Sequence, residues 1–389
     1  MLRNTHAVSP LALLTFLVAP AAAAAEESAA RFDIRYIADV MSNLSGGLET
    51  GSRYMDNLDL SLEVDAERAM GWNGATLFLY GVYNNGKALS GDLVGDAQAL
   101  SSIETGVEAA RLLEAWIDQR FLDDRASIRV GLYDLNSEFD VIDTADLFLH
   151  AAQTTTFALA QSGEAGPSIF PVTSLAARAE FRLTDALLLR TAVLDGVPGD
   201  PDHPKRTAVK LGDGDGALLV SELEYGAGSM RAAAGYWRYT ARFEDLETGR
   251  LRRGNDGIYA LVEGRVYEDP DDPRRGLALY AHGGWASAGV NPFKYSLAAG
   301  AVYTGILPAG PEDDLGLSVA WVESGGPYKR ADDALKREVA FELTYRARIN
   351  DMIAIQPDIQ YVINPGVAPD VKDAFVIGLR LDLAWGTDL

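Results

Sequence analysis

The sequence has no cysteine among its 389 residues. Disulfides, thiolate metal sites, cysteine nucleophiles and a lipoprotein anchor are therefore excluded. Histidine is scarce as well: the four residues are His6, His150, His203 and His282, and none has the spacing of a metal-binding helix motif. We expect no histidine metal centre and predict no cofactor.

Basic residues are also few relative to acidic residues. The chain has 34 Lys and Arg against 56 Asp and Glu, a net charge of −22. A nucleic-acid groove requires clustered Lys and Arg, so nucleic acid is not an expected partner. Beyond the N-terminus no apolar run approaches the roughly 18 residues of a spanning helix, which argues against a membrane protein built from helices.

No segment has the pattern of an enzyme or of a metal site. No nucleophile–base arrangement and no phosphate-binding loop rises above chance. The acidic segments GDGDG (212–216) and EDPDDP (268–273) could offer oxygen ligands to Ca²⁺ but lack the full ligand pattern of a calcium loop. We interpret them as solvated turns and predict that the protein is not an enzyme.

The first 25 residues have the features of a secretory signal peptide. Arg3 precedes an apolar stretch from Leu11 to Val18, and small residues end at Ala25 before two glutamates. We predict cleavage after Ala25, which leaves residues 26–389 as one exported domain.

Alternation of apolar and polar residues dominates this mature chain. In IQPDIQYVINPG (355–366), Ile359 and Tyr361 alternate with Gln356, Asp358 and Gln360, as expected for a strand with one apolar face. The clearest similar segments are 277–285, 295–304, 315–321, 338–345 and 375–385, with others at 58–65, 75–80, 126–133 and 175–182 and weaker ones near 32–40, 111–122, 187–195, 216–226, 229–240 and 256–267. We predict an all-β fold of about sixteen strands, a closed antiparallel transmembrane barrel.

The spacing of these segments supports closure into a membrane barrel, because such barrels join short turns on one side to long loops on the other. The odd-numbered connections are predicted to be long, at about 41–56, 84–110, 134–173, 196–215 and 240–256, with shorter ones near 287–293, 324–336 and 363–373. The even-numbered ones are mostly tight. We expect the long loops outside the cell, with 84–110 and 134–173 constricting the channel.

Aromatic residues at strand ends indicate which face of the strands contacts water. Tyr295 and Tyr303 bracket one segment, and Phe375 and Trp385 bracket another. Such placement is typical of the girdles at lipid–water boundaries, whereas aromatics of a sandwich core need not gather at the ends. We therefore expect the apolar faces to contact lipid and the polar faces to line a water-filled lumen too wide for side chains to fill.

Candidate solute contacts follow from the positions of polar residues on these faces. On one strand Glu114, Trp116, Asp118 and Arg120 share a face, opposite Leu113. An indole among charges suits a sugar, whose C–H faces stack on the ring while charged groups bind hydroxyls. As an alternative, Trp116 packs against a loop and the charges only pair with one another. The predicted channel-lining set is Glu114, Trp116, Asp118, Arg120, Arg129, Asn136, Glu138, Arg178, Arg182, Gln356, Asp358 and Gln360.

Several further members of this set have a competing structural interpretation. Arg129, Arg178 and Arg182 offer forked donors to hydroxyl pairs but equally form wall ladders with acids. Asn136 and Glu138, within LNSEFD (135–140), begin the longest loop, and an Asx-type turn would explain them as well. The neutral amides of Gln356 and Gln360 suit an uncharged solute.

Four blocks of the chain resemble the OprB-type carbohydrate-selective porins of Gram-negative outer membranes. They are LLEAWIDQRFLDDRASIRVGLYDLNSEFDV (112–141), DLFLHAAQ (146–153), ELTYRARINDMIAIQPDIQYVINPG (342–366) and VIGLRLDL (376–383). The resemblance implies a sixteen-stranded barrel that passes sugars by facilitated diffusion, with loops and charged and aromatic residues at the constriction. One departure is the C-terminus, because many such barrels end on an aromatic residue and this chain ends on Leu389.

A carbohydrate porin is thus the leading hypothesis, with sugars and outer-membrane lipid as partners and a monomer or homotrimer as the assembly. The alternatives are a general or cation-preferring diffusion porin, a barrel hydrolase using His150, His203 or His282, and a purely structural barrel. The sequence leaves the sugar, the pore radius and the oligomeric state open.

Overall fold

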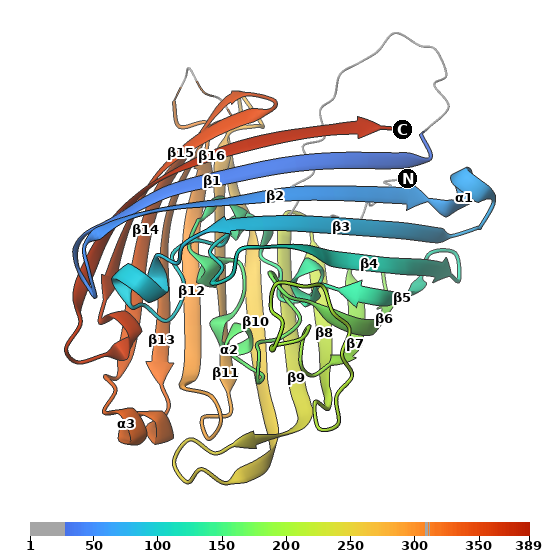
Figure 1. Cartoon of the computed structure of the whole chain (residues 1–389). Helices are drawn as coiled ribbons and strands as arrows, with labels where there is room; N and C mark the ends of the chain where they lie inside the picture. The colour runs from blue at the N-terminus through green and yellow to red at the C-terminus, as the bar shows by residue number, and fades with distance from the viewer. Residues whose placement is uncertain (1–27, 308–309, 311) are drawn as a thin grey trace.

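Sixteen antiparallel strands form a closed barrel. The computed structural model describes residues 28–307, 310 and 312–389, so the predicted signal peptide lies outside it. Each strand bonds to its neighbours in sequence, and β1 closes the barrel against β16 over the register from Arg31↔Asp388 to Gly47↔Lys372 (Figure 1). The predicted strand number, antiparallel pairing and closure are confirmed.

The strands are longer than their apolar segments, and the helices are short. The strands are β1 Ala30–Gly47, β2 Gly51–Asp65, β3 Ala75–Gly86, β4 Ala109–Phe121, β5 Ala126–Tyr133, β6 Ser174–Arg182, β7 Leu187–Asp195, β8 Ala217–Ala227, β9 Met230–Glu244, β10 Leu251–Glu268, β11 Gly276–Ala286, β12 Phe293–Thr304, β13 Asp314–Ser324, β14 Arg337–Asn350, β15 Ile353–Ile363 and β16 Lys372–Asp388. The α-helices are α1 Ala66–Met70, α2 Phe157–Ala160 and α3 Gly326–Asp332, and single turns of other helix types span Ser90–Val94, Leu135–Ser137, Asp143–Leu147, Ala151–Gln153 and Pro365–Val367.

The polar face of the strands points inward, as the alternation predicts. On β15 the side chains of Gln356, Asp358 and Gln360 are buried, while Ile359 and Tyr361 are 43% and 40% exposed on the outside. In a soluble sandwich these positions would be reversed. Across the described residues, no helix is long and apolar enough to cross a membrane.

Two connections differ from the prediction. Residues 41–56 were expected to form a long loop, but β1 and β2 continue to Gly47 and from Gly51, leaving a three-residue turn at 48–50. Likewise, 240–256 is mostly strand, with a connection of only 245–250. Strands can extend past the apolar band of the barrel, and their residues there are mostly polar. Both segments therefore look like loops in the sequence.

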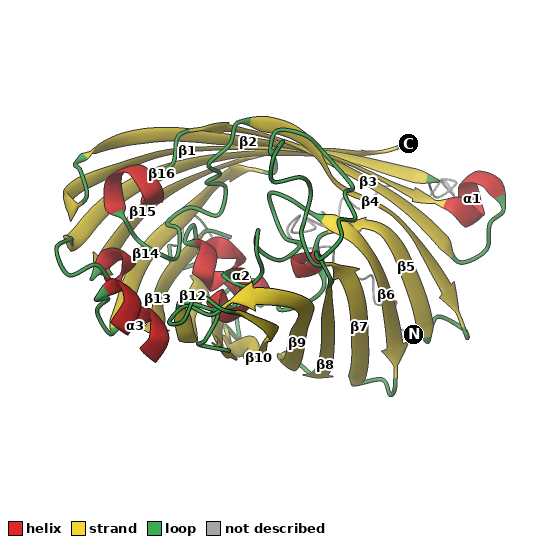
Figure 2. Cartoon of the chain, turned by 60° about the horizontal axis from the view of Figure 1, so that its bottom comes forward, coloured by secondary structure: helices red, strands yellow, loops and turns green. Residues whose placement is uncertain are grey.

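The other long connections are confirmed and lie at one end of the barrel, whereas the start of β1 and the end of β16 lie at the other end, the end of α1 (Figure 1). The two longest are the β3–β4 loop (87–108) and the β5–β6 loop (134–173). Seen along the barrel, loop and helix segments including α2 occupy its interior (Figure 2). The lumen therefore contains backbone as well as wall side chains.

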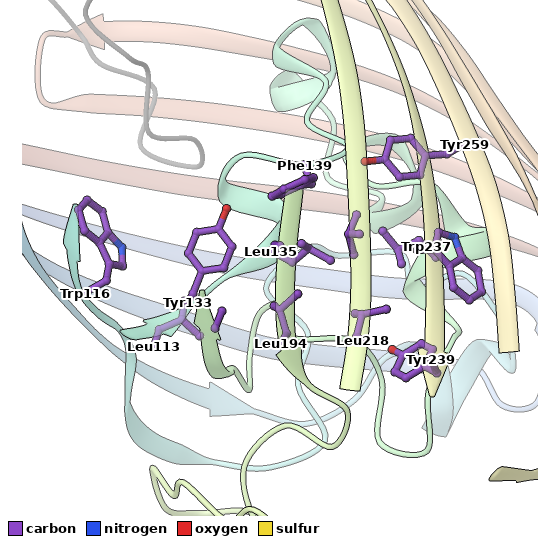
Figure 3. Packing of buried hydrophobic residues seen from close by; sticks show 14 of the residues in the cluster. Leu113, Trp116, Tyr133, Leu135, Phe139, Leu194, Leu218, Trp237, Tyr239 and Tyr259 are labelled. Carbon is purple, nitrogen blue, oxygen red and sulfur yellow. The ribbon is translucent and has the colours of Figure 1, made fainter. Parts of the chain in front are cut away.

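Apolar side chains of the β5–β6 loop form a core with the inner wall. Leu135, Phe139 and Leu159 of the loop belong to one buried cluster with Trp237 and Tyr259 of the wall (Figure 3). Each of these loop side chains is 1% exposed or less. Full burial of a Leu or Phe contributes about 1.5–3 kcal/mol, so this packing favours the inward position of the loop.

Candidate functional site: the constricted lumen

Wall glutamates hold the backbone of the β5–β6 loop by its N–H groups. Glu342 on β14 accepts from Leu149 at 2.6 Å and from His150 at 3.3 Å. Glu263 on β10 accepts from Asp143 and Thr144, Glu222 on β8 from Asp140 at 2.8 Å, and Glu114 on β4 from Asp134 at 3.3 Å. Carboxylate bonds to backbone N–H groups are charge-assisted and strong, so the loop is fixed at points around the barrel.

Wall donors hold the carbonyl groups of the same loop. Arg231 on β9 donates to the carbonyl of Val141 at 2.9 Å, and Gln356 on β15 donates to that of Leu147 at 2.6 Å. The β3–β4 loop is held in the same way, because Gln360 donates to the carbonyl of Leu100 at 2.9 Å. Buried loop backbone thus obtains hydrogen bonds from lumen side chains, as a backbone removed from water requires.

A charged cluster lies where the β5–β6 loop leaves β5. Arg178 on β6 forms ion pairs of 2.8 Å with both Asp118 and Glu138, and Arg129 on β5 lies 3.2 Å and 3.4 Å from the same two carboxylates. Tyr133 also donates to Glu138, at 2.6 Å. Although burial opposes ionisation, Arg129 and Arg178 hold the pKa of Glu138 well below its usual range. Four predicted site residues are therefore together and paired.

Trp116 is enclosed rather than open to the lumen. Its ring stacks on Phe78 of β3, with centroids 4.9 Å apart, and the Arg129 guanidinium lies 3.6 Å from its centroid. Its indole N–H donates to Glu114 at 2.9 Å. With 4% of its surface exposed, the indole has no free face for a sugar, and this geometry matches the loop-packing alternative.

The expected face of Leu113 is wrong. The register between β3 and β4 shifts between Tyr80 and Gly81, a bulge that turns Leu113 inward, where it is 1% exposed. Simple parity counts fail at a bulge. Arg120 is exposed near the end of β4, and Arg182 is half-buried at the end of β6, away from the charged cluster and toward the short-turn end of the barrel.

The predicted residues of β15 and of the loop entry bind loop segments. Gln356 and Gln360 make the carbonyl bonds described above, and Gln360 also donates to Asp358 at 2.9 Å. Asn136 donates to the carbonyls of Phe139 and Asp140 at 3.1 Å each, which is turn bonding. Of the twelve predicted residues, Asn136 lines the central cavity described next.

A cavity of about 330 Å³ remains between the two inward loops and one side of the wall. Its polar lining comes from β1, β2, β16 and the loops: Arg35, Asn57, Asp59, Gln98, Ser102, Asp134, Asn136, Asp146, Thr154, Thr155 and Arg380. Its apolar lining includes Ile37, Tyr80, Ile142, Phe148, Phe157 and Phe170. The sequence prediction missed all of these except Asn136, although Arg35, Asp59 and Arg380 lie on polar strand faces that parity identifies.

The charged groups of the cavity form a fixed pattern. Arg35 pairs with Asp382 at 2.6 Å, and Arg380 pairs with Asp39 through two bonds of 2.8 Å. Asp59 accepts from Tyr80 at 2.7 Å and from Asn57 at 2.6 Å. These bonds fix the side-chain positions, so the cavity is formed before a solute enters.

The β5–β6 loop should respond to pH through Asp140. Burial raises the pKa of Asp140 to about 8, although the N–H and hydroxyl of Thr156 donate to it at 2.7 Å and 2.8 Å. A released loop would restore a pKa of about 3.9, so between these values the inward loop binds more protons than the released loop. Its stability should therefore fall as pH rises from about 4 to 8.

Hydrogen exchange measures this effect. Amides of the β5–β6 loop should open more often at pH 8 than at pH 5, after correction for intrinsic exchange, and Asp140→Asn should reduce the difference. Asp370→Asn, in an exposed loop, is the matched control and should retain it. Equal opening at both pH values in the unmodified chain would contradict the assignment.

Comparison with known proteins identifies the family. The model of the carbohydrate-selective porin OprB family matches residues 49–384. Porin B of Pseudomonas aeruginosa is 25% identical, with 91% of this chain and 87% of that protein covered, and the putative porin QuiX of Acinetobacter baylyi is 20% identical, with 92% and 90% covered.

Solved structures show the same fold. The high-pH structure of Pseudomonas putida OprB has a TM-score of 0.84 at 21% identity, covering 92% of this chain and 94% of that one. The outer membrane channel DcaP of Acinetobacter baumannii has a TM-score of 0.56 at 11% identity, with 92% and 96% covered. The chain belongs to the OprB family of carbohydrate-selective porins and is an outer-membrane channel for carbohydrates.

Proposed function

We propose that sugars pass the barrel through the central cavity, and that the β3–β4 and β5–β6 loops form its constriction. The bonds from both loops to the wall support this, because they hold backbone across the lumen. A volume of about 330 Å³ is at the lower end for small-molecule sites, which suits a monosaccharide or disaccharide.

The observation that carries the proposal is the mixed lining of this cavity. Phe148, Phe170 and Tyr80 offer apolar surface to the C–H faces of a pyranose, while Arg35 and Asn136 offer polar groups to its hydroxyls. A sugar has both kinds of surface on one ring, and a channel for water and ions alone needs no aromatic lining. Solute contact is thus proposed for these residues.

The other predicted residues are given different roles in this proposal. Glu114, Trp116, Asp118, Arg129, Glu138 and Arg178 position the β5–β6 loop, and Gln356, Asp358 and Gln360 position both loops. Arg120 and Arg182 line the inner mouth, where solute leaves toward the periplasm.

A cation preference is the second candidate, and the cavity charges favour it. Among the described residues, the cavity is lined by the carboxyl groups of Asp59, Asp134 and Asp146 and by two cations, Arg35 and Arg380, which already pair with Asp382 and Asp39. The excess of carboxylate would repel anionic solutes while leaving neutral sugars unaffected. Reversal potentials in a salt gradient test this preference directly.

We also propose that residues 1–25 are an export signal and that the outward apolar side chains contact membrane lipid. The basic start, apolar stretch and small-residue end support the signal. The outer exposure of Leu297, Val130 and Ile258, at 53%, 54% and 52%, supports the lipid contact.

Sugar block of the ion current tests the cavity as the binding place. Asp146 accepts no hydrogen bond within the described residues and faces the cavity, so its carboxylate is available to hydroxyls. A hydrogen bond to a charged group contributes about 1.5–3 kcal/mol, so Asp146→Leu should weaken glucose block about tenfold or more. Asp370→Leu, outside the cavity, should leave it unchanged, and equal block in both variants would count against the proposal.

A further inference from the structure

The outer surface of the barrel has an apolar hollow across β7 to β12. It measures about 670 Å³. Three small residues aligned in the strand register, Ala234, Ala260 and Gly283, form its floor. The next register row is bulky, with Tyr236 beside Ile258 and Ile258 beside Trp285. These outward residues make a groove with one raised wall.

Cationic side chains lie beyond the raised wall, toward the long-loop end. Arg238 follows Tyr236 by two residues on the same face of β9, about 7 Å along the strand. Arg242 is opposite Arg253 in the β9–β10 register, and all three arginines are exposed. The Lys294 ammonium lies 4.8 Å from the centroid of the Tyr295 ring, which also lines the hollow.

None of these four cations has a hydrogen bond or an ion pair with any residue that the structure describes. Fewer acids lie at the adjoining register positions: Asp256, opposite Arg238, accepts from Ser287 at 2.8 Å, and Glu244 is opposite Leu251. Glu323, opposite Tyr295, pairs with Lys336 at 3.6 Å. Like charges directly opposite each other, as in Arg242 and Arg253, are unfavourable without an anion between them. In a chain of net charge −22, an unpaired basic cluster at the edge of an apolar surface is unexpected.

We propose that this groove and its cations bind a phosphorylated lipid of the outer leaflet, with an acyl chain in the hollow and its phosphates at Arg238, Arg242, Arg253 and Lys294. The hairpin end of β9 and β10 lies on the same side as α3, among the long loops that face outward in such barrels (Figure 1). The cations therefore lie at the level of the outer head groups. A second copy of the chain would fit less well, because it would bury these charges.

The phosphates supply the specificity. Acyl chains contact neighbouring acyl chains as favourably as they contact an apolar protein surface, so the hollow alone would select little. Each Lys or Arg near a membrane surface strengthens attraction to anionic lipid about fivefold. Three arginines should together account for roughly a hundredfold in binding constant.

Native mass spectrometry of the full chain tests the proposal, with bisphosphorylated lipid A, its dephosphorylated form and inorganic phosphate as probes. The unmodified chain should retain lipid A about a hundredfold more tightly than the variant Arg238→Gln, Arg242→Gln, Arg253→Gln. Inorganic phosphate should not bind measurably. The control Lys205→Gln, Arg206→Gln, Lys372→Gln loses the same charge from exposed sites elsewhere and should bind as the unmodified chain does.

A second variant, Ala260→Leu, fills the floor of the hollow. It should weaken the binding of lipid A through loss of the acyl-chain contact alone. Glucose-driven liposome swelling should be the same in every variant, which shows that each is folded and separates this proposal from the transport function. Three results would overturn the assignment. They are equal retention of lipid A by the triple-arginine variant and the unmodified chain, equal retention of lipid A and its dephosphorylated form, and a second copy of the chain bound at this surface.

Discussion

Glu342→Ala should raise the single-channel conductance severalfold and abolish block by glucose. Glu342 is 1% exposed and holds the N–H groups of Leu149 and His150. Its removal leaves two buried donors without a partner, at about 1–3 kcal/mol each. That penalty favours release of the β5–β6 loop from the wall, which would widen the constriction.

Two further variants define the cause. Glu342→Gln retains an oxygen acceptor and should keep most of the glucose block. Glu323→Ala removes a carboxylate from β13 that pairs with exposed Lys336 at 3.6 Å, and it should change neither quantity. Unchanged conductance in Glu342→Ala, measured in the same bilayers, would show that the loop does not depend on this bond.

Arg178→Met should destabilise the folded barrel by about 3–5 kcal/mol, the usual effect of removing one partner from a buried ion pair. Arg178 is 2% exposed and pairs with Asp118 and Glu138, which remain buried after the change. The temperature at which the barrel unfolds in detergent, followed by gel mobility, should fall clearly.

A compensating variant tests whether charge is the cause. Arg178→Met with Glu138→Gln removes one of the two carboxylates left without Arg178 and should recover part of the lost stability. Arg182→Met, on the same strand but outside the charged cluster, should have little effect. If the single and double variants unfold at the same temperature, the loss comes from packing and not from unpaired charge.

The pH response of Arg178→Met follows from Glu138. The depressed pKa of Glu138 means that it adds stability at neutral pH, and that this stability is lost as pH falls through the folded-state pKa. Without Arg178 the depression should be smaller, so the loss of stability in acid should be smaller and should be complete at a higher pH. Unfolding temperatures between pH 3 and 7 measure this shift.

The wall of the barrel could be predicted because each strand repeats one local rule. Alternation identifies Ile359 as outward and Gln360 as inward with no knowledge of neighbouring strands, and the structure agrees at both positions. The rule fails where the strand has a bulge, as at Leu113, and where polar residues continue a strand, as in 41–56.

The constriction could be predicted only in part, because it depends on the path of the loops. Glu342 and Leu149, which share a hydrogen bond, are 193 residues apart. Parity indicates that Arg35 and Trp116 face inward, but it gives neither their height in the barrel nor what covers them. Trp116 was therefore expected at the solute, although Arg129 and Phe78 enclose it, and Arg35 was overlooked at the cavity.

The most direct measurement of the central claim is the swelling of liposomes that contain the purified chain, with neutral sugars of increasing size and with charged solutes of matched size. A cavity of about 330 Å³ with mixed apolar and polar lining predicts fast entry of monosaccharides, a steep decline for longer oligosaccharides and slow entry of anionic sugar acids. Entry of anionic and neutral solutes at equal rates, with no dependence on sugar length, would contradict it.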